Sequence, residues 1–119
     1  MARGDELRGR TKAYALRVIA LVGALPRGAT ADVLGRQLLR AATSVGANYR
    51  AACRAHSPED FVAKLKIVEE EADECLYWLE LLVESDLAPR ERVADLLAEG
   101  NEILAITVAS IKTVRSQKR

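Results

Sequence analysis

The sequence predicts an all-α fold, an antiparallel up-down-up-down four-helix bundle that takes up residues 1–119 as a single domain. Half of the 119 residues are hydrophobic but only 4% are aromatic, and the abundant Ala and Leu favour helix. Apolar residues recur at spacings of three and four in four segments, near residues 5–25, 31–55, 58–85 and 89–115. Only a few residues separate these segments, so each helix is expected to run antiparallel to the next.

The first two segments each show one apolar face with the period of a helix. In the first segment this face ends before Pro26 and consists of Leu7, Tyr14, Val18, Leu21 and Leu25. In the second segment it consists of Leu34, Leu38, Ala41, Val45, Tyr49 and Ala52. We expect both faces to lie in the core of the bundle.

The third and fourth segments have clear starting points. Ser57 is suited to cap a helix, and Pro58 is suited to its first turn. The apolar face that follows consists of Phe61, Leu65, Val68, Ala72, Cys75, Leu79 and Leu82. The fourth helix is expected to start at Ala88-Pro89, with a core face of Val93, Leu97, Leu104, Val108 and Ile111.

One stretch of the third segment is too apolar for a single buried face. Between Cys75 and Val83 only Glu80 is charged. A helix that is apolar around most of its circumference is usually covered on more than one side. We therefore predict an oligomer interface, although these side chains would alternatively only widen the core face. The predicted interface residues are Leu76, Tyr77, Trp78 and Leu81.

The net charge of +1 hides a strong segregation of charge along the chain. Residues 1–56 contain ten Lys and Arg against three Asp and Glu, whereas residues 57–111 contain four against fourteen. The last eight residues add four positive charges. The protein is therefore not a uniformly basic nucleic-acid-binding protein.

Within the second segment the arginines form a stripe nearly opposite the apolar face. Arginines at this spacing suit a phosphate backbone, because each guanidinium can bind two oxygens. The alternative is a solvated face that pairs with acidic side chains of a neighbouring helix or subunit. The candidate nucleic-acid-binding residues are Arg36, Arg40, Arg50 and Arg54.

The sequence carries no recognisable catalytic or metal-binding pattern. The acidic run Glu69–Glu74 lacks the histidines of a di-iron bundle, since His56 is the only histidine, so we expect a solvated surface or a partner for arginines. We expect no cofactor, no small-molecule substrate and no enzyme activity. Cys53 and Cys75 fall on different helices and are expected to be small, buried apolar residues with free thiols in a cytoplasmic protein.

No segment is apolar enough to be expected to span a membrane, and Arg17 interrupts the only stretch that would imitate a secretory signal.

Asn48 lies beside the apolar face of the second segment. A polar residue in that position is expected to fix the register of neighbouring helices.

Several runs resemble the "four helix bundle protein" family, whose members are encoded in intervening sequences of bacterial large-subunit ribosomal RNA genes. The main run reads QLLRAATSVGANY from Gln37 to Tyr49, and it contains the shared motif residues Gln37, Arg40, Ser44 and Asn48. Further matches are Ser57, Asp60-Phe61, residues 64–67, Glu71-Ala72 and residues 77–82. The chain departs from the family pattern at Ala51, Glu69 and Glu70.

The resemblance implies a small antiparallel bundle that assembles into a ring-like homo-oligomer, typically a pentamer. It also implies kinship with the accessory protein of diversity-generating retroelements, which binds nucleic acid and reverse transcriptase. We expect a non-enzymatic oligomer that binds RNA or an RNA-bound protein through the basic faces of the first two helices. The alternative is a protein–protein scaffold in which the segregated charges serve subunit assembly, without nucleic-acid binding.

Overall fold

A computed structural model describes residues 2–117, apart from the side chains of Ala2, Arg3 and Asp5. These residues form four helices and no strand, which confirms the predicted all-α bundle. The bounds differ from the predicted ones by at most three residues, because the breakers that end each apolar repeat also end the helices. The helices are α1 (Ala2–Gly23), α2 (Ala29–Cys53), α3 (Pro58–Glu84) and α4 (Arg90–Gln117).

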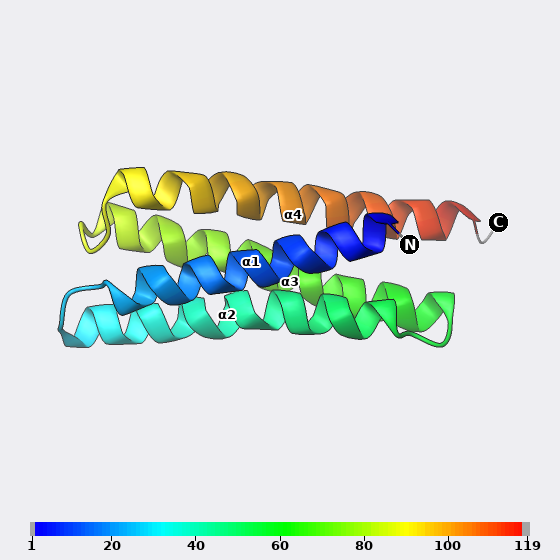
Figure 1. Cartoon of the computed structure of the whole chain (residues 1–119), viewed down its shortest axis with the longest axis horizontal. Helices are drawn as coiled ribbons and strands as arrows, with labels where there is room; N and C mark the ends of the chain where they lie inside the picture. The colour runs from blue at the N-terminus through cyan, green and yellow to red at the C-terminus, as the bar shows by residue number, and fades with distance from the viewer. Residues whose placement is uncertain (1, 118–119) are drawn as a thin grey trace.

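The helices run up, down, up and down in a bundle of 50 × 21 × 20 Å. Figure 1 shows the α1–α2 and α3–α4 connections at one end, and the α2–α3 connection with both chain termini at the other. Helix α2 contacts α3 most extensively, whereas α1 contacts α2 much more than it contacts α4. The α2–α3 seam is therefore the most extensive contact between helices, followed by the α3–α4 and α1–α2 seams.

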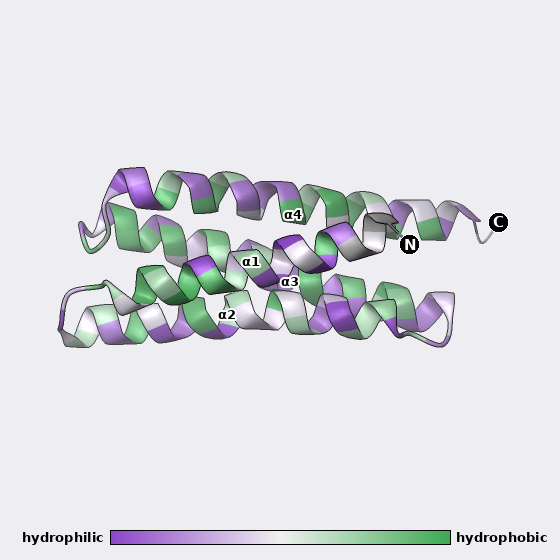
Figure 2. Cartoon of the chain, viewed as in Figure 1, coloured by the Kyte–Doolittle hydropathy of each residue, from purple (hydrophilic) through white to green (hydrophobic). Residues whose placement is uncertain are grey.

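The core follows the predicted apolar faces of the first three helices. Leu38, Val45, Leu65 and Leu79 are fully buried. Hydrophobic and hydrophilic residues alternate in bands along each helix in Figure 2, as the period of a half-buried helix requires. Within residues 2–117, no helix combines the length and the apolar character needed to cross a bilayer.

The predicted core face of α4 is partly wrong. Its fully or nearly fully buried residues include Leu96, Gly100, Ile103 and Thr107, while the predicted members Leu97, Leu104 and Val108 are only half-buried. The true face passes through two positions that do not look apolar in the sequence. At one of them the Thr107 hydroxyl donates a hydrogen bond to the Ile103 carbonyl at 2.7 Å, which allows its burial.

Both ends of α3 are closed by local hydrogen bonds. The Ser57 hydroxyl accepts a hydrogen bond from the Asp60 amide at 3.0 Å, which confirms the predicted cap. At the other end Asp86 adopts the left-handed conformation with φ of 60°. The Leu87 amide then donates to the Leu82 carbonyl and the Asp86 amide to the Val83 carbonyl, the pattern of a Schellman motif.

Candidate nucleic-acid interface

The four arginines of the α2 stripe are all exposed, but they face three different surroundings. Arg40 faces α3, Arg50 and Arg54 lie beside α1, and Arg36 lies near the α1–α2 connection. The stripe is therefore not one site.

Arg40 is neutralised by two carboxylates of α3. Its Nη1 lies 3.3 Å from Glu71 Oε2, and its Nη2 contacts Glu74 Oε1. The hydrogen bond to Glu71, followed by that carboxylate's charge and the contacts to Glu74, raises the pKa of Arg40. With two carboxylates on one guanidinium, Arg40 offers little positive charge to an external phosphate.

The motif residues of α2 continue this contact into a hydrogen-bonded seam. The Ser44 hydroxyl donates to Glu71 Oε2 at 3.1 Å. The Asn48 amide donates to the Ser44 carbonyl and hydroxyl oxygens, at 3.0 and 2.9 Å. Among the described motif residues, only Arg40 and Ser44 bond to α3, whereas Asn48 bonds within α2 and holds the Ser44 hydroxyl in place. The motif thus has a structural role in joining α2 to α3. Gln37, the remaining motif residue, is also half-buried.

Arg50 and Arg54 line a hollow of about 460 Å³ between α1 and α2, here called the basic groove. Arg8 and Lys12 of α1 also line it. The remaining lining residues are small or hydroxyl-bearing, and they are Gly9, Thr11, Ala15, Thr43, Gly46 and Ala47. The groove therefore has a floor without large side chains and cations contributed by both helices.

No acidic residue is among those that line the basic groove. Lys12, Arg50 and Arg54 form no ion pair with the described side chains. Arg10, only two residues from Lys12, faces α4 instead and binds Glu99 through two hydrogen bonds of 2.9 and 2.8 Å. Three cations without an ion pair among the described side chains are thus gathered in the groove.

The sequence pattern did not single out the cations of α1. Arg8 and Lys12 are four residues apart, as are Arg50 and Arg54, so each pair lies on one helix face. That spacing was the available signal. Which of the α2 arginines would join the α1 pair depends on the neighbours of each helix face, which the sequence alone does not give.

Arg36 lies outside the basic groove. It lines a separate hollow near the α1–α2 connection together with Val22, Leu25 and Leu39. That hollow also contains Asp32, and most of its wall is apolar. Arg36 is exposed as predicted, but it does not share a cavity with the other arginines of the stripe.

The predicted oligomer interface divides in the structure. Leu76 is only 8% exposed and packs inside the chain, since its Cδ2 would lie 2.9 Å from a Cβ at Gly100 of α4. The expectation for Leu76 is corrected accordingly, because α4 already covers this side chain. Trp78 and Leu81 are half-buried, whereas Tyr77 is 55% exposed. The Tyr77 and Trp78 rings meet edge to face, with 5.2 Å between their centroids.

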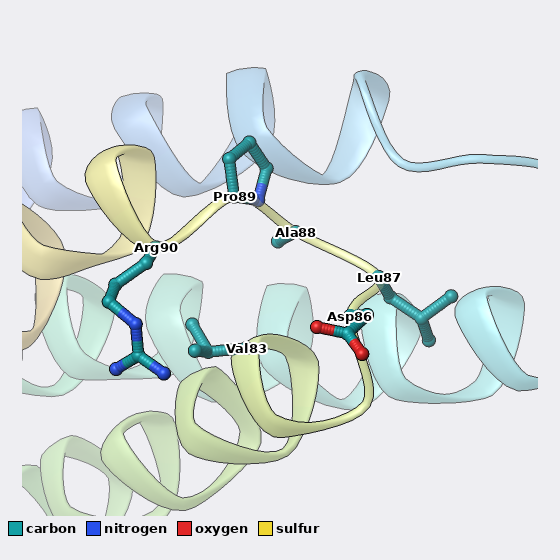
Figure 3. Close-up of a pocket in the computed structure, with 6 residues that line it drawn as sticks. All are labelled: Val83, Asp86, Leu87, Ala88, Pro89 and Arg90. Carbon is teal, nitrogen blue, oxygen red and sulfur yellow. The ribbon is translucent and has the colours of Figure 1, made fainter.

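The hollow at the α3–α4 connection gives no catalytic arrangement. Figure 3 shows this hollow, of about 370 Å³, with the Arg90 side chain on the side opposite the Pro89 ring. Its lining includes no histidine, cysteine or serine. Among the described residues, no three His, Cys, Asp or Glu side chains are grouped so as to hold a metal ion.

Residues 6–109, which include both walls of the basic groove and the α2–α3 seam, match the sequence pattern of the 23S rRNA-intervening sequence proteins. The chain belongs to this family. The match confirms the resemblance carried by the α2 motif. Neither the description of the family nor that of the solved relative below states a catalytic activity.

A solved structure has the same fold. It is a protein of unknown function from the S23 ribosomal protein family of Bacteroides thetaiotaomicron, 34% identical in sequence, with a TM-score of 0.85. The alignment covers 92% of this chain and 97% of the relative. Among curated proteins, none matches the chain significantly.

Proposed function

We propose that the protein binds RNA through the basic groove and has no enzymatic role. The observation that supports this is the convergence of Lys12, Arg50 and Arg54 on one hollow whose lining contains no carboxylate. Arg10 and Arg40, by contrast, are occupied by carboxylates of α4 and α3. Lys12, Arg50 and Arg54 are therefore available to an anionic ligand.

A phosphate backbone fits the chemistry of the groove. Each arginine can donate two parallel hydrogen bonds to one phosphate, and a lysine adds a point charge. The family takes its name from an intervening sequence of 23S rRNA, so RNA is the first polyanion to test. Binding by such contacts releases counterions, so its strength falls steeply as salt rises.

The test compares the wild type with the variant Lys12→Ala/Arg50→Ala/Arg54→Ala on one duplex RNA over a salt series. Loss of three phosphate contacts should lower the slope of log K against log salt by about 2 to 3. The control variant Arg90→Ala/Arg92→Ala/Arg115→Ala removes three exposed cations of α4 and the same net charge. It should keep the wild-type slope. Equal losses in both variants, or no binding by the wild type in low salt, would contradict the proposal.

Self-association is a second candidate function, and exposed Tyr77 on the outer face of α3 favours it. Asp73 and Glu80 lie one turn to either side of Tyr77, and both are exposed and without an ion pair among the described side chains. An exposed aromatic residue is typical of a protein interface, whose rim is polar.

A second apolar group extends this surface across the α2–α3 seam. Val33 is 54% exposed and lies seven residues before Arg40, while Leu81 lies seven residues after Glu74. Seven residues complete nearly two turns, so Val33 and Leu81 face the same seam about 10 Å beyond the Arg40–Glu74 contact. The apolar surface thus continues from Tyr77 toward α2.

We propose that a second copy of the chain docks there through its own α1. Leu16 and Ile19 of α1 are 58% and 48% exposed, and Lys12 lies one turn before Leu16. Arg36 of α2 lies across the α1–α2 seam, in one hollow with Val22 of α1. This basic, apolar surface complements the acidic, apolar surface around Tyr77, so the contact joins two different faces and is head-to-tail.

Charge reversal tests this contact in the absence of RNA. The variants Asp73→Lys/Glu80→Lys and Lys12→Glu/Arg36→Glu should each be monomeric in sedimentation, because each loses one of the two faces. Their mixture should form a one-to-one complex, because each retains the face that the other lacks. Two monomeric variants that do not combine when mixed would exclude a head-to-tail contact, and two variants that assemble like the wild type would exclude these faces altogether.

A further inference from the structure

The lining of the basic groove lacks two kinds of side chain that commonly contact bases. Its lining contains no aromatic ring on which a base stacks and no Asn or Gln amide that would pair with a base edge. The Thr43 hydroxyl donates to the Leu39 carbonyl at 2.9 Å, and the Thr11 hydroxyl donates to the Arg8 carbonyl at 3.1 Å. Both hydroxyl protons are therefore committed to their own helix.

The floor of the groove leaves room for a chain to approach closely. A Cβ placed at Gly9 would have no atom within 4 Å, so this position is open. Ala47 is exposed on the opposite helix. A Cβ at Gly46 would already contact α1, 3.5 Å from the Thr11 carbonyl oxygen, so the open part of the floor is at Gly9 and Ala47.

The cations are arranged along this space. Arg50 and Arg54 are four residues apart on α2, which places their Cα atoms about 6 Å apart along the helix axis. Arg8 and Lys12 have the same spacing on the antiparallel α1. Two rows of positive charge therefore border the open floor, and each row runs along the groove.

We infer that the basic groove holds one sugar-phosphate strand along its length and binds it through its phosphates. The walls supply positive charge from both sides of the strand, and the open floor at Gly9 and Ala47 supplies the space. This inference rests on the proposed function of the same groove.

A charge-neutral block tests the strand's position. The variant Gly9→Gln/Ala47→Gln fills the floor without changing the charge, and Gly23→Gln/Ala24→Gln is its control at exposed positions near the α1–α2 connection. We expect the block to weaken binding by about tenfold or more and the control to change it by less than about twofold. Unfolding curves of both variants confirm that they are folded.

A second arm uses ligands that differ only in what surrounds the phosphates. An RNA and a DNA strand of the same sequence, and strands of unrelated sequence, should bind within about threefold of one another. Inorganic polyphosphate, which has neither base nor sugar, should compete with all of them. An unaffected block variant, a strong preference for RNA or for one sequence, or failure of polyphosphate to compete would overturn the inference.

RNA binding by the groove and the lengthwise position of the strand are disproved by different results. If the wild type binds no nucleic acid, or binds equally well without Lys12, Arg50 and Arg54, the proposed function itself is wrong. If those cations are required but the floor is not, RNA binding stands and the lengthwise strand does not.

Discussion

The hydroxyl of Tyr14 in α1 lies directly against Gly100 of α4, so close that a Cβ at Gly100 would stand 3.0 Å from the hydroxyl oxygen. Tyr14 is 1% exposed, and its hydroxyl has no hydrogen-bond partner among the described residues. Burial raises the pKa of Tyr14 above its usual range. The absence of a side chain at Gly100 is thus what allows α1 and α4 to meet around this ring.

Gly100→Ala should destabilise the protein, because the new methyl group would clash with both Tyr14 and Leu76. Overpacking of this kind costs about 1 to 3 kcal/mol, which exceeds the gain of up to about 1 kcal/mol from replacing a helical glycine. Gly9→Ala is the control, since its Cβ meets no atom within 4 Å, and it should stabilise. Denaturant unfolding measures both. A Gly100→Ala protein as stable as Gly9→Ala would show that this contact is not tight.

Asp86→Gly should stabilise the protein by about 0.5 to 1 kcal/mol. Asp86 holds a φ of 60° at the end of α3, where a residue with a Cβ is strained and glycine is not. The hydrogen bonds of the Schellman motif use only backbone atoms, so they remain in the variant. Thermal unfolding measures the change. A lower melting temperature than that of the wild type would mean that the Asp86 side chain makes a larger contribution than the strain it causes.

The Arg10–Glu99 pair should stabilise the fold in neutral but not in strongly acidic solution. The hydrogen bonds from Arg10 hold the pKa of Glu99 below its usual range. Because the pKa is lower in the folded than in the unfolded state, this stability is present above the usual glutamate pKa of about 4.3 and is lost as the pH falls through the folded value.

Arg10→Ala should therefore lower the free energy of unfolding by about 1 kcal/mol at neutral pH, and by less at about pH 3. Arg92→Ala is the control, because Arg92 is exposed and forms no ion pair among the described side chains. Denaturant unfolding at both values of pH gives the comparison. A cost that is the same at both would contradict the assignment of this stability to the Glu99 carboxylate.

The two cysteines should differ sharply in reactivity. Cys53 is exposed, contrary to the expectation, whereas Cys75 is fully buried, and burial raises its pKa to about 12. A thiol reagent at pH 8 should modify one thiol in the native protein and two in denaturant, since the thiolate is the reactive form. Cys53→Ser should leave no reactive thiol in the native state. Rapid modification of both thiols would show that the region around Cys75 opens readily.

The sequence predicted the fold well because each helix carries a regular apolar repeat, and its failure on α4 has a local cause. Gly100 and Thr107 are buried for reasons that hydropathy does not express: close approach of Tyr14 and a hydroxyl satisfied within its own helix. The position of Leu76 was missed for the same reason. Leu76 is buried because its side chain occupies the space that a side chain at Gly100 would fill.

The candidate site was only partly predictable. Arg40 and Arg50 both lie on the predicted stripe, yet they differ by about 80° around the helix, enough to turn one toward α3 and the other toward α1. The sequence shows that both are on the outer side of α2. Which carboxylates or cations they meet depends on how α1 and α3 pack against that helix.

This difference supplies the measurement that tests the central claim most directly: the affinity of Arg50→Ala and of Arg40→Ala for one duplex RNA in the same low-salt buffer. The two variants lose the same residue type from the same helix and have the same net charge. If the basic groove is the site, Arg50→Ala should bind about fivefold to tenfold more weakly than the wild type. Arg40→Ala should bind like the wild type. Equal affinities of the two variants would contradict the groove, and a larger loss in Arg40→Ala would place the site on the α2–α3 seam.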